Sequence, residues 1–160
     1  MRICIISDTH DNLAEVRKLV DKLNCLDCGM LIHCGDICGP GVLQELARLR
    51  CEVHCCFGNM DDKGQVSKAA AETRVRCHGE KGMLEVEGRK IGFVHLPNLA
   101  YKMAESGEFH VVFYGHTHLV NKEYIGKTLF VNPGEIQGRK WSPSFALYET
   151  VSGDVRIQRL

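Results

Sequence analysis

The sequence predicts an α/β fold that contains two packed mixed β-sheets with helices outside them. Two observations lead to this prediction. Strand-like and helix-like segments alternate from the N-terminus to about residue 57, and hairpin patterns dominate the chain after about residue 84. No repeat, linker or low-complexity tract divides the chain. We therefore expect a single domain over residues 1–160, a length that is sufficient to bury a full core.

The first half of the chain alternates strands with helices. Short apolar segments are typical of strands, and longer segments carry apolar residues at helical spacing. In chain order, the expected elements are the strand Arg2–Ser7, the helix Asn12–Cys25, the strand Gly29–His33, the helix Gly41–Leu49 and the strand Glu52–Phe57. One apolar face of the first helix is formed by Leu13, Val16, Leu19, Val20 and Leu23. This order implies parallel strands with right-handed crossovers.

The second half of the chain is richer in strands. Turn residues around Gly88, Gly126 and Gly153 predict three hairpins. They pair Leu84–Val86 with Lys90–Val94, Lys122–Ile125 with Thr128–Val131, and Ser144–Thr150 with Asp154–Gln158. A short helix around Leu99–Glu105 is expected to lead into the apolar strand Val111–Tyr114.

The charge balance and the apolar segments exclude some classes of partner. The formal net charge is zero, so the sequence gives no indication of a basic surface for a nucleic-acid duplex or a membrane. No apolar stretch approaches the roughly 18 residues that span a bilayer, and the N-terminus does not resemble a signal peptide. We expect a cytoplasmic protein without a membrane partner.

Nine cysteines are a high and odd number for a chain of this length. Cys4, Cys34, Cys55 and Cys56 fall in or beside apolar strands, where a free cysteine behaves as a small hydrophobic residue. A secreted disulfide scaffold would be shorter and normally carries an even number, which favours a reducing cytoplasm. A structural zinc or redox site formed by Cys25, Cys28, Cys34 and Cys38 is the less favoured alternative.

Polar side chains follow directly after five of the expected strands. They belong to Asp8-Thr9-His10, Gly35-Asp36, Gly58-Asn59, His95 and Gly115-His116-Thr117-His118. Ligands bind beyond the carboxyl ends of the strands in open α/β sheets. Because residues i and i+2 of an extended backbone point to one side, we expect Asp8 to face the same place as His10, and His116 the same place as His118. The three glycines are expected to let the backbone turn sharply as it leaves the sheet.

These donors predict a centre with two metal ions. They combine carboxylates, an amide oxygen and imidazoles, a set that favours Mn, Fe, Ni, Co or Zn over Mg or Ca. One ion does not need so many donors, whereas two ions roughly 3.5–4 Å apart, bridged by a carboxylate, would use all of them. Such a pair would lower the pKa of a bridging water to about 7 and supply a bridging hydroxide as the nucleophile. We interpret the remaining histidines, His33, His54, His78 and His110, as packed or surface residues.

The ordered motifs, from Asp8-Thr9-His10 to Asn132-Pro133-Gly134, resemble those of the calcineurin-like metallophosphoesterase superfamily, in particular its small bacterial and archaeal phosphodiesterases. The resemblance implies a four-layer α-β-β-α sandwich. It also implies that one metal ion is held by Asp8, His10, Asp36 and His118, and the other by Asp36, Asn59, His95 and His116, with Asp36 as the bridge. Asp36, Asn59 and His95 are expected to act in catalysis. Mn²⁺ is the expected ion, with Ni²⁺, Co²⁺, Fe²⁺ and Zn²⁺ as alternatives.

The implied activity is hydrolysis of a small phosphoester, in the first place a phosphodiester. A nucleotide-derived substrate and a homodimer are left open. Many members of the family carry a histidine as general acid where this chain has Met60, which cannot transfer a proton. General-acid catalysis contributes about 10²–10⁴-fold, so we expect a preference for esters with good leaving groups. Glu135 stands where serine is common in the family, and the sequence gives it no role.

A binding module is the main alternative function. The same fold resembles a subunit of the retromer coat, which holds protein partners on an apolar surface and has degraded metal ligands. All seven inferred ligand positions of this chain carry competent side chains, which favours catalysis.

Overall fold

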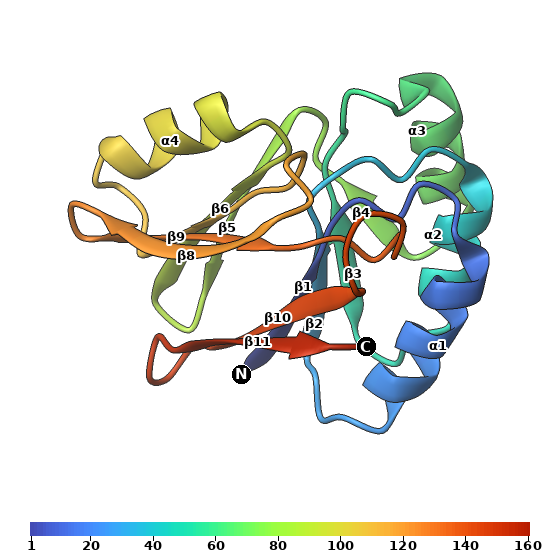
Figure 1. Ribbon diagram of the computed structural model, residues 1–160, viewed down its shortest axis with the longest axis horizontal. Helices are drawn as coiled ribbons and strands as arrows, with labels where there is room; N and C mark the ends of the chain where they lie inside the picture. Colours follow the sequence, from blue (N-terminus) through green and yellow to red (C-terminus); the bar gives the residue numbers. More distant parts are fainter.

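The computed structural model describes residues 1–160, which form two β-sheets and four helices (Figure 1). The helices are α1 (Leu13–Asn24), α2 (Pro40–Leu46), α3 (Lys63–Glu72) and α4 (Pro97–Glu105). The strands are β1 (Arg2–Ile6), β2 (Met30–His33), β3 (Glu52–Cys55), β4 (Val75–Cys77), β5 (Lys81–Val86), β6 (Arg89–Val94), β7 (Val111–Phe113), β8 (Val120–Ile125), β9 (Thr128–Pro133), β10 (Ser144–Glu149) and β11 (Val155–Arg159).

Both sheets are mixed, as the sequence predicts. The first sheet has the order β11-β10-β1-β2-β3-β4, in which β1 to β4 are parallel and the hairpin β10-β11 joins antiparallel to β1. The second sheet has the order β5-β6-β7-β9-β8. Its three central strands are parallel, and its two edge strands are antiparallel to their neighbours.

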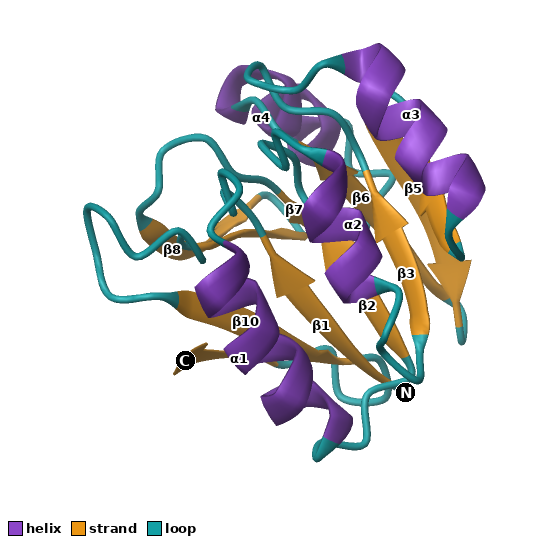
Figure 2. Ribbon diagram, turned by 90° about the vertical axis from the view of Figure 1, so that its right-hand side faces the viewer, coloured by secondary structure: helices purple, strands orange, loops and turns teal.

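The two sheets and the helices form four layers. Helices α1, α2 and α3 cover the outer face of the first sheet, and α4 covers the outer face of the second (Figures 1 and 2). The side chains of each strand alternate between two apolar clusters because successive residues point to opposite faces. In β1, Ile3 and Ile5 lie between the sheets, whereas Cys4 and Ile6 pack under the helices. The predicted α-β-β-α sandwich is therefore confirmed.

The start of the first helix follows from its capping residue. Asn12 precedes α1, and its side chain accepts a hydrogen bond from the Glu15 backbone N–H at 3.4 Å. Four residues of the predicted apolar face are buried, and Leu13 packs against the same cluster from the rim. None of the helices has the length and apolar character that crossing a bilayer would require.

Two elements between Asp61 and Leu84 are absent from the sequence-based expectation, namely α3 and β4. Helix α3 buries only Val66, Ala69 and Ala70, so its apolar periodicity is weak, and β4 has only three residues. A local signal for the helix was available in Asp62, whose carboxylate accepts a hydrogen bond from the Gln65 backbone N–H at 3.0 Å as an N-cap.

Candidate metal centre

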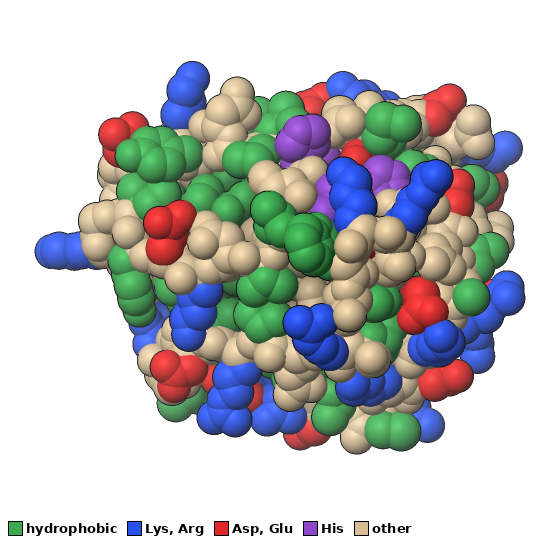
Figure 3. Space-filling view, in the orientation of Figure 1, with side chains coloured by type: hydrophobic (Ala, Val, Ile, Leu, Met, Phe, Trp, Pro, Cys, Tyr) green, Lys and Arg blue, Asp and Glu red, His purple; other side chains and the backbone are tan.

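Loops from both sheets meet at one edge of the sandwich. The loop after β1 is held to the loop after β2 by the backbone N–H groups of Asp8 and His10, which donate to Gly35 and Asp36 at 3.1 Å. The loop after β7 joins them because the His116 N–H donates to Asp8 Oδ2 at 3.1 Å. Figure 3 shows histidines gathered on this part of the surface, with Lys and Arg side chains beside them.

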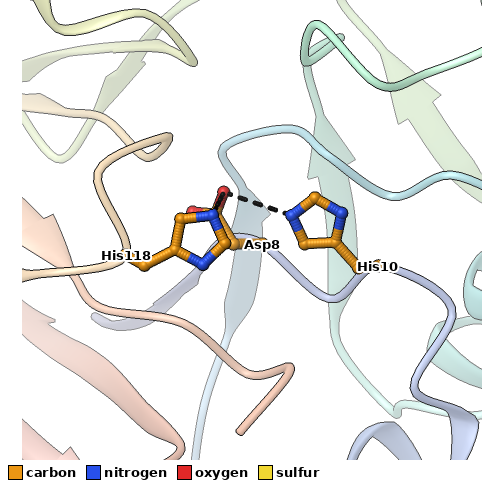
Figure 4. A group of neighbouring side chains, drawn as sticks. All are labelled: Asp8, His10 and His118. Carbon is orange, nitrogen blue, oxygen red and sulfur yellow. Dashed lines mark ion pairs between the residues drawn. The ribbon is translucent and has the colours of Figure 1, made fainter. Parts of the chain in front are cut away.

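The first group of donors consists of Asp8, His10 and His118 (Figure 4). Asp8 Oδ1 lies 3.5 Å from His118 Nε2 and 3.8 Å from His10 Nε2. The two imidazole rings stack, with 5.3 Å between their centroids. Asp8 is fully buried, and His10 and His118 bring two imidazole nitrogens to its carboxylate.

Two atoms of this first group are left without a hydrogen-bond partner. Asp8 Oδ1 and His10 Nε2 are both buried, and their contacts with neighbouring charged groups, at 3.4–3.8 Å, do not form hydrogen bonds. An unpaired polar atom in a protein interior is costly and needs a physical explanation. A cation between these atoms would satisfy both of them, so the donors present fit a metal ion.

The second group consists of Asp36, His95 and His116, and Asn59 lies against it. Asn59 Oδ1 is 3.0 Å from His95 Nε2 and 2.8 Å from His116 Nδ1. Two donors bound at right angles to one ion at about 2.1 Å are about 3 Å apart. The spacing of these atoms therefore also fits a metal ion.

Asp36 connects the two groups. Its Oδ2 lies 3.4 Å from His10 Nε2 in the first group and 3.3 Å from His95 Nε2 in the second. Its other oxygen, Oδ1, accepts a hydrogen bond from the Met60 N–H at 2.9 Å. One carboxylate oxygen thus faces donors that come from different sheets.

The carboxylates create a field that favours positive charge. The Asp8 carboxylate raises the pKa of His10 above its ordinary value. Burial acts to lower the pKa of His95, but the contact with Asp36, the charges of Asp36 and Asp8 and the Cys34 carbonyl together outweigh it, and the pKa is raised. Burial acts to raise the pKa of Asp36, but the contact with His95 and the Met60 N–H outweigh it, and the pKa is lowered. Each of these shifts has the sign expected of a site that attracts cations.

Two histidines are oriented by acceptors on their outer nitrogen. His95 Nδ1 lies 2.8 Å from the Cys34 carbonyl oxygen, and His118 Nδ1 is hydrogen-bonded to the Glu135 carboxylate. An acceptor there keeps the hydrogen on Nδ1 and leaves Nε2 to face the donors of its group. The role of Glu135 could not be predicted, because nothing in the sequence indicates that it touches His118.

Glu135 also holds the loop that follows it. Its Oε1 accepts hydrogen bonds from the backbone N–H groups of Lys140 and Trp141, at 2.7 and 2.8 Å. Burial acts to raise the pKa of Glu135, but these donors and His118 outweigh it, so the pKa is lowered. A fully buried carboxylate therefore fixes both an imidazole and a surface loop.

The backbone carries strain at most of the donors. Asp8, His10, Asp36, His116 and His118 all have positive φ, between 40° and 70°. Residues other than glycine pay about 1–3 kcal/mol for such a conformation, which persists where the surroundings impose it and is concentrated at functional sites.

The expectation of extended backbone at these donors is therefore wrong. Asp8 and His10 do face one place, but through left-handed conformations. His116 and His118 separate, because His118 joins the first group and His116 joins the second. The resemblance to the family implies the same division.

Two of the three glycines that were expected to permit sharp turns instead allow neighbouring loops to pack closely against them. Only Gly35 has a positive φ, of +91°. A Cβ atom at Gly58 would lie 2.1 Å from Asp36 Oδ1, and one at Gly115 would lie 1.9 Å from Ser7 Oγ. The loops can pack this closely around the donors only because these positions have no side chain.

His33 connects two of the loops that carry the donors. Its Nδ1 accepts a hydrogen bond from the Gly35 N–H at 3.1 Å, so its Nε2 carries the hydrogen and donates to Thr9 Oγ1 at 3.0 Å. Complete burial lowers its pKa to about 4. His33 is a packed residue, as predicted, but it ties together the two loops that carry Asp8 and Asp36.

The cysteines contribute to neither group of donors. All nine are free, and Cys4, Cys34, Cys55 and Cys56 are buried as expected. Cys34 lies in the cluster between the sheets, whereas Cys28 packs against the cluster under the helices. This separation argues against a zinc site shared by the four cysteines from Cys25 to Cys38.

Comparisons with known proteins agree with this geometry. Residues 1–153 match the family model of the calcineurin-like phosphoesterase superfamily domain. A phosphodiesterase of Methanocaldococcus jannaschii is 30% identical over 146 residues, which cover 86% of this chain and 86% of the relative. A probable metallophosphoesterase of Bacillus subtilis is 28% identical over 141 residues, which cover 86% of this chain and 76% of the relative.

Solved structures of similar shape include an archaeal phosphodiesterase. It has a TM-score of 0.92 and 28% identity, with full coverage of both chains. Vps29 of Entamoeba histolytica in complex with zinc has a TM-score of 0.74 and 22% identity, covering 100% of this chain and 98% of Vps29, and shares the fold.

The fold and the two donor groups are those of the metallophosphoesterases, a class of enzymes that hydrolyse phosphoesters. Membership of this class implies divalent metal ions. Within that class, this chain belongs to the calcineurin-like phosphoesterase superfamily, which confirms the resemblance seen in the sequence.

The burial of His33 predicts a loss of stability in acid. The unfolded chain takes up a proton on this residue near pH 6.5, whereas the folded protein resists protonation until about pH 4. The free energy of unfolding should therefore fall as the pH drops through this window, by on the order of 2–3 kcal/mol for His33.

The substitution His33→Asn should remove this contribution, because an amide can accept from the Gly35 N–H without titrating. Urea unfolding of the metal-free protein between pH 4 and 7 measures it. His110→Asn is the matched control, since exposed His110 also accepts a backbone hydrogen bond, from Lys90 at 3.0 Å. Equal pH dependence in the wild type and in His33→Asn would contradict the prediction.

The contact between Glu135 and His118 predicts an effect on metal affinity. Loss of an outer carboxylate that orients a ligating histidine typically weakens metal binding about 10–100-fold. Glu135→Gln should weaken binding of one ion by a factor in this range, measured by calorimetric titration of the metal-free protein with Mn²⁺. Glu149→Gln is the control, because Glu149 pairs with Arg2 at the far end of β10. Unchanged affinity in Glu135→Gln would rule out the orienting role.

Proposed function

We propose that the protein is a phosphodiesterase that works with two divalent metal ions. The observation that carries the proposal is the position of Asp36 Oδ2, within 3.4 Å of a histidine of each donor group. In the proposed centre, Asp8, His10, Asp36 and His118 hold one ion, and Asp36, Asn59, His95 and His116 hold the other. When bound, two such ions activate a shared water as the nucleophile and neutralise charge on the phosphoryl oxygens.

The side chains of the protein would position the reacting groups, admit the substrate and attract its phosphate. Asp36, Asn59 and His95 are the residues that we assign to catalysis, because they stand where the two groups meet. Asn59 and His116 are exposed, so a substrate can approach from this side. The loop held by Glu135 carries Arg139 and Lys140, both exposed, whose charge favours a phosphate near the centre.

The nature of the metal ions and of the substrate follows from the same chemistry. Imidazole and carboxylate donors without thiolates fit a divalent ion of the first transition series. We propose Mn²⁺ in the first place, with Ni²⁺, Co²⁺, Fe²⁺ and Zn²⁺ as alternatives. A small phosphoester fits a centre that is open on one side, and we propose a nucleotide-derived diester.

Residues 1–160 would act as one domain, because both sheets contribute donors. The nine free cysteines favour work in the cytoplasm, and assembly as a homodimer is compatible with this site.

Metal content and hydrolysis together test the proposed activity. We expect about two ions per chain, and hydrolysis of bis(p-nitrophenyl) phosphate that is lost with EDTA and restored by Mn²⁺ or Ni²⁺. Asp36→Asn and His116→Ala should each lower kcat about a hundredfold or more. His110→Ala, a change of an exposed histidine outside both groups, should leave it unchanged. Full metal occupancy without any hydrolysis would instead favour a scaffold for protein partners.

Met60 predicts the response of the rate to the leaving group. The apolar side chain cannot protonate a departing oxygen, so among methyl aryl phosphates kcat/KM should fall steeply as the pKa of the leaving phenol rises. Met60 is 60% exposed, and Met60→His should fold normally and flatten this dependence. Met83→His, at an equally exposed methionine of β5, is the control. A rate that does not depend on the leaving group in the wild type would show that another residue acts as the acid.

A further inference from the structure

Two grooves open beside the candidate metal centre, one next to each donor group. The first has a volume of about 240 Å³, reaches Asn59 and His95, and is lined in part by Asp61, Lys63 and Glu80. The second has a volume of about 340 Å³ and begins at His118. We call the second groove the Trp141 groove, and its lining includes His118, Leu119, Val120, Trp141, Ile157 and Arg159.

The Trp141 groove exposes apolar side chains for which the fold gives no reason. The exposed fractions are 49% for Leu119, 51% for Val120 and 56% for Trp141. Leu119 directly follows a donor of the first group, and Figure 3 shows hydrophobic side chains beside the histidines on this face. An exposed apolar patch that is continuous with a polar centre is typical of a ligand site.

The groove is held in place by the same carboxylate that orients His118. Glu135 accepts the backbone N–H of Trp141 at 2.8 Å and is also hydrogen-bonded to His118. From the other side, the Leu160 N–H donates to the Pro143 carbonyl oxygen at 2.9 Å, which ties the C-terminal residues to this loop. The backbone that carries the indole is therefore tied to the donors, as a preformed binding site requires.

We propose that the Trp141 groove binds the nucleobase of a nucleoside phosphodiester, which deepens the proposed function and rests on it. A base lies one sugar away from its phosphate, so a phosphoryl group at the metal centre would bring the base to a groove that starts at His118. Bases stack on aromatic side chains, and the volume is near the lower end of the roughly 300–1,000 Å³ of small-molecule sites. Arg159 and Ser142 add polar groups at the rim that can bond to the edge of a base.

The first groove is a poorer place for a base. Its cation, Lys63, is already paired with Glu80, and the Asp61 carboxylate already accepts the backbone N–H groups of Cys38 and Gly58. Its aromatic ring, Phe57, is only partly exposed and lies beneath Lys63, whose Nζ is 5.9 Å from the ring centroid. The open aromatic surface is on the side of His118.

The single tryptophan of the chain provides a direct test. Fluorescence of Trp141 should be quenched saturably by adenosine 5′-monophosphate, in the metal-free and in the Mn²⁺-loaded protein. Ribose 5-phosphate, which has the same phosphate without the base, should cause no comparable quenching. Leu119→Asp should weaken the binding of the nucleotide about tenfold or more. Leu99→Asp, at a leucine of the first groove, should not change it.

Hydrolysis adds a second readout. Thymidine 5′-(p-nitrophenyl phosphate) and methyl p-nitrophenyl phosphate have the same leaving group and differ in the ester group that is retained. Trp141→Ala should lower kcat/KM for the thymidine ester about tenfold, through KM, and leave the methyl ester unchanged. Tyr124→Ala, at an exposed aromatic residue that lines neither groove, should affect neither ester.

The outcomes separate this inference from the proposed function. Absence of hydrolysis with every metal ion would refute the phosphodiesterase, whereas saturable quenching by the nucleotide would still support the groove. Hydrolysis without such quenching, or an equal loss for both esters in Trp141→Ala, would overturn the groove as the site of the base and leave the phosphodiesterase intact.

Discussion

The carboxylate of Asp36 joins the two halves of the molecule. One of its oxygens faces His10, from the loop after β1, and His95, from the end of β6 in the other sheet. A nearly buried negative charge requires partners, and here they arrive from both sheets. The geometry of the centre therefore depends on how the two sheets pack. A shift of one sheet against the other would separate Asp36 from His10 or from His95.

The loops meet this constraint at the expense of backbone strain. Five donors adopt positive φ, and the glycines at 58 and 115 allow neighbouring loops to approach more closely than a Cβ atom would permit. The apolar clusters on both sides of the first sheet supply the stability that this strain opposes. Asp8 Oδ1 and His10 Nε2 form no hydrogen bond within the protein, so the folded chain alone does not complete the centre.

Glu135 extends the order of the centre to the surface. This buried carboxylate contacts His118 on one side and the backbone of Lys140 and Trp141 on the other. Its charge is stabilised by those donors, which outweigh its burial. The loop that carries Arg139, Lys140 and Trp141 is thus connected to the first donor group through one carboxylate. A substitution in this loop should therefore alter the position of His118, and a substitution at His118 should alter the Trp141 groove.

The sequence by itself determined the order of most elements, the two mixed sheets and the residues that gather at the candidate centre. Apolar alternation is a local property, and donors that follow strands must gather at the carboxyl ends of those strands. The sequence did not reveal α3 and β4, whose local patterns are weak. Only the tertiary structure decided that His116 and His118 divide between two groups, that Asp36 stands between the sheets, and that Glu135 reaches His118. These contacts join residues that are far apart in the chain, and the left-handed conformations that allow them are imposed by packing, which no local pattern encodes.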